Sequence, residues 1–266
     1  MSVRIIEISA ASAHRWAHKV ATLEEGVTYP LGDDRFTLDH GADYFAFFRR
    51  LGDLVYLAAV EAGEVVAVFA GALREVPQGG RMVKAWYLCD LKVRPSHRGR
   101  RLPLKMLASA LPRHIGRSAR GYGITMNPPS GENRVVRLFR RFPLLPVKVG
   151  PQLLFWSLSS AQMADVAALV VRHRGPMGFL SHSGRKDLML ESTGAPMPLL
   201  HVQFGPLAEG VIEKPLEGHV HMLCAPEDDG LADDLMGMGL APSATATVLH
   251  HRMGGTDWRW VLTSDI

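Results

Sequence analysis

The stretch from Lys84 to Leu111 limits the folds open to this chain more than any other part of the sequence. It reads KAWYLCDLKV, RPSHRGRR and LPLKMLASAL, which predicts a strand, a basic turn and a helix in that order. The strand, residues 84–93, is apolar on both faces over its middle, so we expect it in the centre of a sheet. The helix repeats apolar residues at the spacing of a single helical face: Leu104, Leu107, Ala108 and Leu111.

Positive charge is concentrated around this turn. Between Lys84 and Arg141 the chain has fourteen Lys or Arg residues and two acidic ones, Asp90 and Glu132, a net charge of +12. The whole chain carries only +4. A helix start offers unpaired N–H groups and the positive end of the helix dipole, which together bind anions. We therefore expect an anionic ligand here, with a solvated basic surface as the alternative.

Composition excludes several protein classes. The 266 residues are 47% apolar and 21% charged, which is typical of a soluble chain with one large or two small domains. Only Cys89 and Cys224 occur, so we expect no disulfide framework and a reducing compartment. No apolar run reaches the roughly 18 residues that cross a membrane, and the first residues lack the apolar core of a signal peptide. These features predict a cytoplasmic protein that does not bind membranes.

Patterning predicts two regions. Residues 1–158 are expected to follow the order β-α-α-β-β-β-α-β-α-β, with a tight hairpin at 61–64. The expected elements there are strands at 3–8, 54–60, 65–73, 84–93, 123–126 and 147–158, helices at 13–23, 44–48, 104–111 and 132–142, and a loop at Pro30 and Gly32. Residues 159–266 are expected to form a smaller α+β domain, with helices at 160–171 and 228–238 and strand-like runs at 187–190, 199–204, 219–224, 244–252 and 258–263.

The order of elements and the basic turn resemble the GNAT superfamily of N-acyltransferases over residues 3–158. Five residues stand where the motifs of that family require them: Val93, Pro95, Arg98, Gly99 and Leu102. Arg101 and Pro103 depart from the motif, because they occupy positions usually held by Gly and by Gly or Ala. The second region echoes the first, but its central turn, CAPEDDG, is acidic. A second, degenerate GNAT-like unit without a phosphate site is therefore one interpretation of residues 159–266.

The resemblance implies an α/β fold with a mixed, mostly antiparallel sheet flanked by helices, and it implies a ligand. In the family, the turn cradles the pyrophosphate of coenzyme A, and the end of the preceding strand pairs with the pantetheine arm. The acyl donor would be acetyl-CoA or another acyl-CoA. The residues that the resemblance assigns to cofactor binding are Leu91, Lys92, Val93, Arg98, Gly99, Arg100, Arg101, Leu102 and Asn133.

Asp90 is the catalytic candidate. Many relatives use a carboxylate on this strand to take a proton from the acceptor amine, and Asp90 is the only acidic residue on it. Alternation places Asp90 on one face with Trp86, Leu88 and Lys92, so pairing with Lys92 or an arginine is the alternative role. Cys89 is expected to be a core residue rather than a nucleophile, because direct attack on a thioester needs no covalent intermediate.

The helix at 132–142 lies where relatives place an Asn near the pantetheine and a Tyr that protonates the departing thiolate. Asn133 is present, but the Tyr position falls on or near Phe139, which donates no proton. Tyr122 is the nearest other phenol in the sequence. Three arginines recur on one helical face, either solvated or in contact with the 3′-phosphate of coenzyme A: Arg134, Arg137 and Arg141.

No metal site is expected, although the chain has twelve histidines. His219 and His221 share a strand face, but no spacing of ligands in the sequence is diagnostic.

By resemblance, the expected activity is transfer of an acyl group from acyl-CoA to an amine on a small molecule or a protein. The first alternative is a catalytically decayed relative that binds acyl-CoA or a protein partner. The second is a nucleic-acid binder, but no known binding module occurs, so specific recognition of nucleic acid is not expected. The acceptor, the acyl length and the oligomeric state stay open, with a homodimer as one option.

Overall fold

The computed structural model describes residues 2–31, 34–141, 146–210 and 212–266. The strands are β1 (Arg4–Glu7), β2 (Tyr29–Leu31), β3 (Asp34–Asp39), β4 (Asp53–Glu61), β5 (Glu64–Gln78), β6 (Arg81–Val93), β7 (Gly121–Met126), β8 (Lys148–Leu158), β9 (Met177–Leu180), β10 (Asp187–Leu190), β11 (Leu199–Phe204), β12 (Val220–Pro226) and β13 (Ala244–His251). The α-helices are α1 (Ala13–Ala21), α2 (Ala46–Arg50), α3 (Leu102–His114), α4 (Arg134–Arg140), α5 (Ser160–Arg174) and α6 (Gly230–Gly237).

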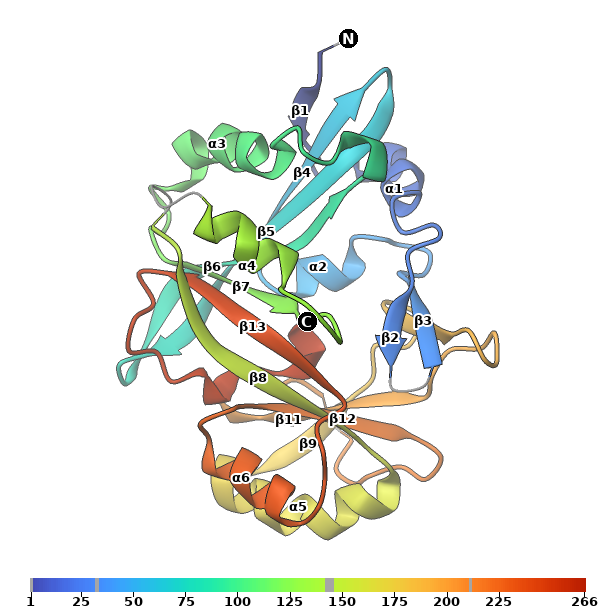
Figure 1. Ribbon diagram of the computed structural model, residues 1–266, viewed down its shortest axis with the longest axis vertical. Coiled ribbons are helices and arrows are strands. Elements are labelled where there is room, and N and C mark those ends of the chain that lie inside the picture. The colour runs from blue at the N-terminus through green and yellow to red at the C-terminus, as the bar shows by residue number, and fades with distance from the viewer. Residues whose placement is uncertain (1, 32–33, 142–145, 211) are drawn as a thin grey trace.

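Within these residues, one long sheet has the order β1-β4-β5-β6-β7-β13-β8-β12-β11-β9, and a small sheet has the order β10-β3-β2. Figure 1 shows the long sheet extending through the molecule, with α1 and α3 near one end and α5 and α6 at the other. Among the strands of the described residues, only the pairs β6–β7 and β11–β12 are parallel. The expected mixed, mostly antiparallel sheet with flanking helices is confirmed. None of the helices in the described residues combines the length and apolarity of a membrane span.

The hairpin between β4 and β5 follows directly from its sequence. Glu61 pairs with Glu64, which leaves the two-residue loop Ala62–Gly63 with φ angles of 52° and 82°. Two positive φ angles are the geometry of a type I′ turn, whose twist matches the twist of the strands that it joins. The hairpin predicted at 61–64 is therefore confirmed.

Helices cover both faces of the first half of the sheet. Val20 of α1 and Phe47 of α2 belong to the core on one face, together with Tyr56 of β4. Leu102 and Met106 of α3 pack on the opposite face against the alternate residues of β4. Burial of side chains of this size stabilises by about 1.5–3 kcal/mol each. It also fixes the start of α3 directly after the basic turn.

The two predicted regions share one sheet, because β13 lies between β7 and β8. Residues 246–251 pair antiparallel with residues 121–126 on one side, and residues 244–250 pair with β8 on the other. In Figure 1 this strand, drawn in red, crosses the middle of the molecule next to the green strands of the first half. The boundary at residues 158–159 stays a prediction, and the hydrogen-bonded sheet continues across it.

The second half has its own core and its own helix signals. Ser159 and Gln162 form a capping box at the start of α5, each side chain binding the backbone N–H of the other. Trp156 of β8 is fully buried in this core, with Val166 of α5 and Leu235 of α6 packed in the same cluster. Strands β11 and β12 are parallel, as β6 and β7 are in the first half.

Two expectations from the pattern are wrong, one because of a distant strand pair and the other because of a local cap. The loop expected around Pro30 contains β2 and β3, because β3 pairs with β10, far along the chain. The run 258–263, expected as a strand, contains a 3₁₀ turn at Trp258–Trp260, which the Asp257 side chain caps by accepting from the Arg259 N–H. Strand β9 was not expected at all. The expected positions Gly32 and Phe142 lie outside the described residues.

The chain ends in a buried ion cluster that joins both halves. Asp265 is only 4% exposed and accepts hydrogen bonds from Arg74 of β5 at 2.7 Å and from Arg50 of α2 at 3.2 Å. Arg50 also donates to Glu209 at 2.6 Å and to the carbonyl of Ser264. The last residues are therefore held against the first half by charged hydrogen bonds.

Candidate functional site

Strands β6 and β7 separate along their length. They pair through Trp86–Gly121, Tyr87–Tyr122 and Leu88–Gly123, while β6 continues to Val93 and β7 to Met126. A Cβ on Gly123 would stand 3.0 Å from the carbonyl oxygen of Leu88, so glycine lets the last pair approach closely without crowding. Beyond it, the edge of β6 at Leu91 and Val93 has no partner strand within the described residues. Its backbone groups are free to bind another molecule.

A β-bulge lies on β6 at this point. The register between β5 and β6 shifts after Ala70–Cys89, and Asp90 has a φ angle of 49°. The extra residue of a bulge reverses the alternation of side chains beyond it. Tyr87 and Cys89 therefore share the core of one face with Lys92, although the sequence pattern placed Lys92 on the face of Trp86. The predicted alternation is wrong beyond the bulge.

Asp90 is held in a buried hydrogen-bond network. Its carboxylate binds Lys92 and the hydroxyl of Tyr56, and the hydroxyl of Tyr44 lies 3.4 Å from it. Lys92 also donates to Tyr44 at 3.0 Å and forms a second ion pair with Glu24. The structure therefore brings the catalytic candidate into contact with Lys92, the partner foreseen in its alternative role.

The charges in this network decide the protonation of Asp90. Burial opposes its ionised form, but the charge and hydrogen bond of Lys92 and the hydroxyl of Tyr56 outweigh burial and lower its pKa. Asp90 and the other acceptors raise the pKa of Lys92 against the same burial. The pair is therefore ionised, and a carboxylate with a lowered pKa is a weak proton acceptor.

The basic turn has the backbone that its sequence predicts. After a 3₁₀ turn at Pro95–His97, Gly99 has a φ angle of 82° with open space above it, and Arg101 has a φ angle of 57° at the start of α3. Arg101 thus keeps the left-handed conformation that glycine adopts easily, at a cost of about 1 kcal/mol for a residue with a side chain. Leu102 is buried and anchors the helix. The first N–H groups of α3 have no partner within the helix and point toward the turn.

Glu61, at the end of β4, binds two side chains of the turn. Its carboxylate accepts from Arg100 at 2.8 and 2.9 Å and bonds His97 at 2.7 Å. These hydrogen bonds lower the pKa of Glu61 to about 2. A cleft of about 420 Å³ lies next to them, lined also by Arg94. Arg100 is therefore engaged within the protein, whereas the side chain of Arg98 is exposed beside the turn.

Asn133 holds α4 against the end of β7. Its Oδ1 accepts from the N–H groups of Val135 at 2.9 Å and Val136 at 3.3 Å, which caps the helix. Its Nδ2 donates to the carbonyl of Met126 at 3.1 Å and to Asn127 at 3.0 Å. The side chain of this predicted cofactor ligand thus positions the helix next to the opening between β6 and β7.

The remaining candidates divide between core and surface. Tyr122 is buried and stacks on Tyr87 with ring centres 4.9 Å apart, and burial raises its pKa. Burial likewise raises the pKa of the Cys89 thiol, which disfavours the thiolate that a nucleophile requires. Phe139 is half-buried, and the three arginines on α4 and just after it are exposed: Arg134, Arg137 and Arg141. In the part of the chain that the structure describes, no group of three or more His, Cys, Asp or Glu side chains is placed to hold a metal.

Two charged residues beside Asp90 were not singled out by the sequence. Glu24 follows α1, and Lys186 lies in the loop before β10 of the second half. Burial and the charge of Lys92 lower the pKa of Lys186 to about 8, and Asp90 and Cys89 also act on it. Its Nζ donates to the carbonyl of Ile266. A single lysine in a loop carries no local pattern, so only the tertiary structure shows its position.

Comparison with known proteins identifies the architecture. No protein-family model and no curated protein matches this sequence. A GCN5-related N-acetyltransferase from Anabaena variabilis aligns over 95% of this chain and 73% of its own, with 8% identity and a TM-score of 0.51. A tandem GNAT protein from the clavulanic acid biosynthesis pathway aligns over 96% of this chain and 100% of its own, with 12% identity and a TM-score of 0.50.

This chain has a tandem GNAT fold. Because the tandem protein aligns over both halves, the resemblance expected for residues 3–158 is confirmed and a second GNAT unit is present. In the first GNAT unit, the sheet order β6-β7-β13-β8 includes a strand from the second half. Identities this low establish the fold, and the reaction has to be argued from the site itself.

Proposed function

We propose that this chain binds acyl-CoA in the opening between β6 and β7 and transfers the acyl group to an amine. The observation that carries the proposal is the separation of these two parallel strands after Leu88, next to the basic turn. The free edge at Leu91 and Val93 can exchange hydrogen bonds with the amides of the pantetheine arm, as an added strand would. The turn from Arg98 to Leu102 offers the N–H groups of a helix start and positive charge to the pyrophosphate.

The residues present fit this ligand. Open space above Gly99 lets phosphate oxygens approach the backbone, and the left-handed Arg101 preserves the shape of the turn. Arg98 is exposed beside that space and carries a guanidinium that can bind phosphate with two hydrogen bonds. Lys92 and Asn133, also assigned to the cofactor by resemblance, would act by shaping β6 and α4 rather than by direct contact.

The proposed acyl transfer depends little on a general acid or a general base. The thioester supplies the activated acyl group. A neutral amine attacks its carbonyl carbon, the carbon–sulfur bond breaks, the nitrogen loses a proton to water, and the departing thiolate gains a proton from water. Positioning alone supplies much of the rate in such a transfer. Because Asp90 is paired with Lys92 and has a lowered pKa, we assign it to holding the bulge of β6, with base catalysis as the competing role.

Thermal unfolding with and without coenzyme A, acetyl-CoA and a long-chain acyl-CoA tests the binding step. We expect the midpoint to rise with ligand, because a ligand at a hundred times its Kd stabilises the native state by about 2.7 kcal/mol. The double variant Arg98→Glu and Arg101→Glu should abolish the rise. Arg113→Glu, which reverses one charge at the far end of α3, serves as the control. No rise at millimolar ligand in the unaltered protein would refute the proposal.

A catalytically decayed relative is the second candidate, favoured by Phe139 in place of a proton donor. It predicts the same thermal shifts but no release of free thiol from acetyl-CoA with any amine in a screen. Release that depends on an amine would exclude it. Asp90→Asn then separates the two roles of Asp90. Loss of a catalytic base lowers kcat most at low pH, whereas loss of a structural ion pair lowers the stability of the protein at every pH.

A further inference from the structure

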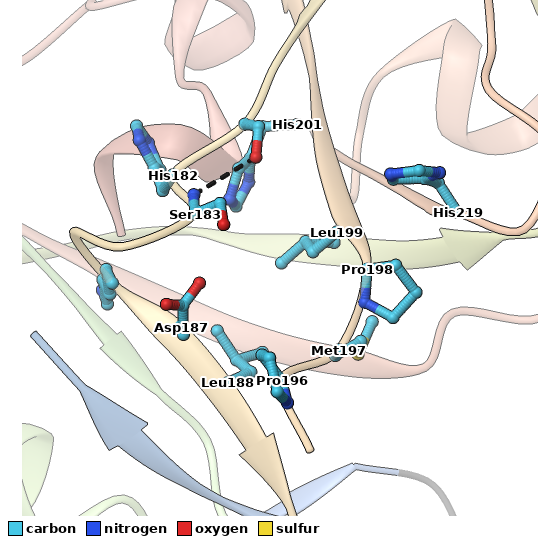
Figure 2. A pocket seen from close by; sticks show the side chains of 12 residues that line it. His182, Ser183, Asp187, Leu188, Pro196, Met197, Pro198, Leu199, His201 and His219 are labelled. Atoms are coloured by element: carbon cyan, nitrogen blue, oxygen red, sulfur yellow. Dashed lines mark hydrogen bonds between the residues drawn. The ribbon is translucent and has the colours of Figure 1, made fainter. Parts of the chain in front are cut away.

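A second cavity lies in the second GNAT unit, between the loop before β10 and the start of β11. Its volume is about 250 Å³. Figure 2 shows Ser183 and Asp187 on one side of it, facing Leu199 and Pro198 on the other. Further apolar side chains, Leu188 and Met197, complete the lining. Its wall thus combines an apolar surface with a few polar groups, as small-molecule sites do.

The hydrogen bonds of two buried histidines fix which of their nitrogens are acceptors. His182 Nε2 lies 2.9 Å from the carbonyl of Ser264, so Nε2 carries the hydrogen and Nδ1 is the acceptor nitrogen. His201 Nδ1 lies 3.0 Å from the hydroxyl of Thr263, which donates its own hydrogen to the carbonyl of Met222. His201 Nδ1 is therefore the donor, and Nε2 of the same ring is the acceptor. Within the described residues, His182 Nδ1 has no partner.

The hydrogen bond of a third histidine in the lining also shows which of its nitrogens is the acceptor. His219 Nδ1 lies 3.1 Å from the carbonyl of Glu217, which leaves Nε2 as the acceptor in the neutral ring. Asp187 adds a carboxylate, which accepts one hydrogen bond from the N–H of Gly184 at 2.8 Å and has capacity for more. The cavity therefore offers several acceptors, and its cation, Lys186, donates to Ile266.

A cavity lined by hydrogen-bond acceptors fits a ligand that donates hydrogen bonds. A metal ion is the first such partner to consider, but the described side chains are not placed to hold one. Burial lowers the pKa of His182 to about 3 and that of His201 well below its usual value, so both rings stay neutral acceptors at physiological pH. A protonated amine donates up to three hydrogens, and the apolar lining suits a hydrocarbon body attached to it.

Lys186 links the cavity to the charged centre of the first unit. It lines the cavity and lies close enough to Asp90 of β6 for that carboxylate to raise its pKa against the effect of burial. An amine bound to the carboxylate of Asp187 is held as an ammonium group, which has to lose a proton before its nitrogen attacks a thioester.

We propose that this cavity binds the primary amine of a small, partly apolar acyl acceptor, through His201 Nε2 and the carboxylate of Asp187. The role as acceptor site rests on the proposed function. Amine binding does not, because it depends only on the groups that line the cavity.

Binding of phenethylamine to the full chain, measured by isothermal titration or ligand-observed NMR, tests this proposal. Its neutral analogue 2-phenylethanol has the same body and should bind at least about tenfold more weakly, the loss expected for a charge-assisted hydrogen bond. Asp187→Asn should weaken the amine by a similar factor, and Leu188→Trp, which fills the cavity, should abolish binding. Asp233→Asn, an exposed change on α6, serves as the control. Equal binding of amine and alcohol, or unchanged binding in Leu188→Trp, would overturn the proposal.

Turnover separates this inference from the proposed function. If the variants weaken amine binding as expected but no amine causes release of thiol from acetyl-CoA, the transferase is refuted and the amine site is kept. Amine-dependent release with an unchanged KM for the amine in Asp187→Asn and Leu188→Trp keeps the transferase and refutes the acceptor site.

Discussion

At the scale of single residues, Lys92 holds together the charged centre of the first unit. It lies between the carboxylates of Asp90 and Glu24 and is 16% exposed at its side chain. Charges attract or repel more strongly when water is excluded, so two buried carboxylates without this cation would be costly. The position of Lys92 also explains why the bulged backbone at Asp90 is tolerated, since its side chain bonds the residue with the unfavourable φ angle.

Lys92→Met is expected to destabilise the protein by about 3–5 kcal/mol, because it leaves buried carboxylates without their counter-charge. Urea unfolding at neutral pH measures the change. Lys19→Met provides the matched control, since Lys19 pairs with Glu64 at 3.5 Å on the surface and should cost less than about 1 kcal/mol. Similar losses in the two variants would contradict a central role for Lys92.

Buried histidines make stability depend on pH. Burial is the largest cause that lowers the pKa of His40 and His182 to about 3, while an unfolded histidine titrates near about 6.5. The unfolded chain therefore binds protons first as the pH falls, and stability is lost from about pH 6.5 downward, by about 1 kcal/mol per histidine at pH 5.5.

His40→Phe isolates one of these contributions. His40 has no hydrogen-bond partner in the described residues and packs on the ring of Tyr44 with centres 4.4 Å apart, so an aromatic ring fits its place. We expect the difference in unfolding free energy between pH 7.5 and pH 5.5 to shrink by about 1 kcal/mol in this variant. An unchanged difference would show that His40 titrates alike in both states.

The predictability of the site also differs from residue to residue. The strand and the basic turn followed from spacing and composition, which are local, whereas Asn133 was singled out by the family resemblance as a cofactor ligand and not as a cap. The bulge at Asp90 did not follow from spacing or composition, because an aspartate in the left-handed region leaves no periodic trace. Lys186 and Glu24 could not be inferred, since each reaches Lys92 or its neighbours only through the folded chain.

At the scale of elements, α4 depends on one side chain for its position. Asn133 caps the helix through Oδ1 and ties it to the end of β7 through Nδ2. Strand β6 and helix α3, by contrast, are set by patterns of their own. This difference explains why α3 was predicted well and why the short strands β2, β3 and β9 were missed. Strand β2 pairs with β3, but β3 and β9 pair with strands further along the chain.

Asn133→Ala is expected to cost about 1–2 kcal/mol, because it removes the cap and leaves the carbonyl of Met126 without its donor. Asn133→Ser keeps a capping oxygen but not the donor, and should recover part of the loss. Urea unfolding followed by circular dichroism measures both variants. Identical stabilities for the two would mean that the cap contributes nothing.

At the scale of the whole molecule, the buried cluster around Asp265 joins the last residues to α2 and β5. Its two arginines, Arg50 and Arg74, come from the first half of the chain. The local sequence does not predict such a contact, because the residues that form it are separated by about 190 residues or more. The sequence predicted both halves but could not show that they share ion pairs and a sheet.

Asp265→Asn should destabilise the protein by about 3 kcal/mol or more, since it leaves buried guanidinium groups partly unpaired. Asp257→Asn is the control, because Asp257 pairs with Arg259 on the surface and should change stability by less than about 1 kcal/mol. Thermal and urea unfolding of both variants decide between these outcomes. A mild effect of Asp265→Asn would place the anchoring of the tail elsewhere.

The place of β13 has a consequence for synthesis on the ribosome. Strands β7 and β8 emerge early, but the strand that belongs between them emerges about 90 residues later, a delay of about 5–20 s at ordinary translation rates. During that interval both strands expose unpaired edges, which are templates for aggregation. The nascent chain must therefore keep this gap open or protected until residues 244–251 arrive, so its yield in cells should depend on chaperones and on the speed of translation.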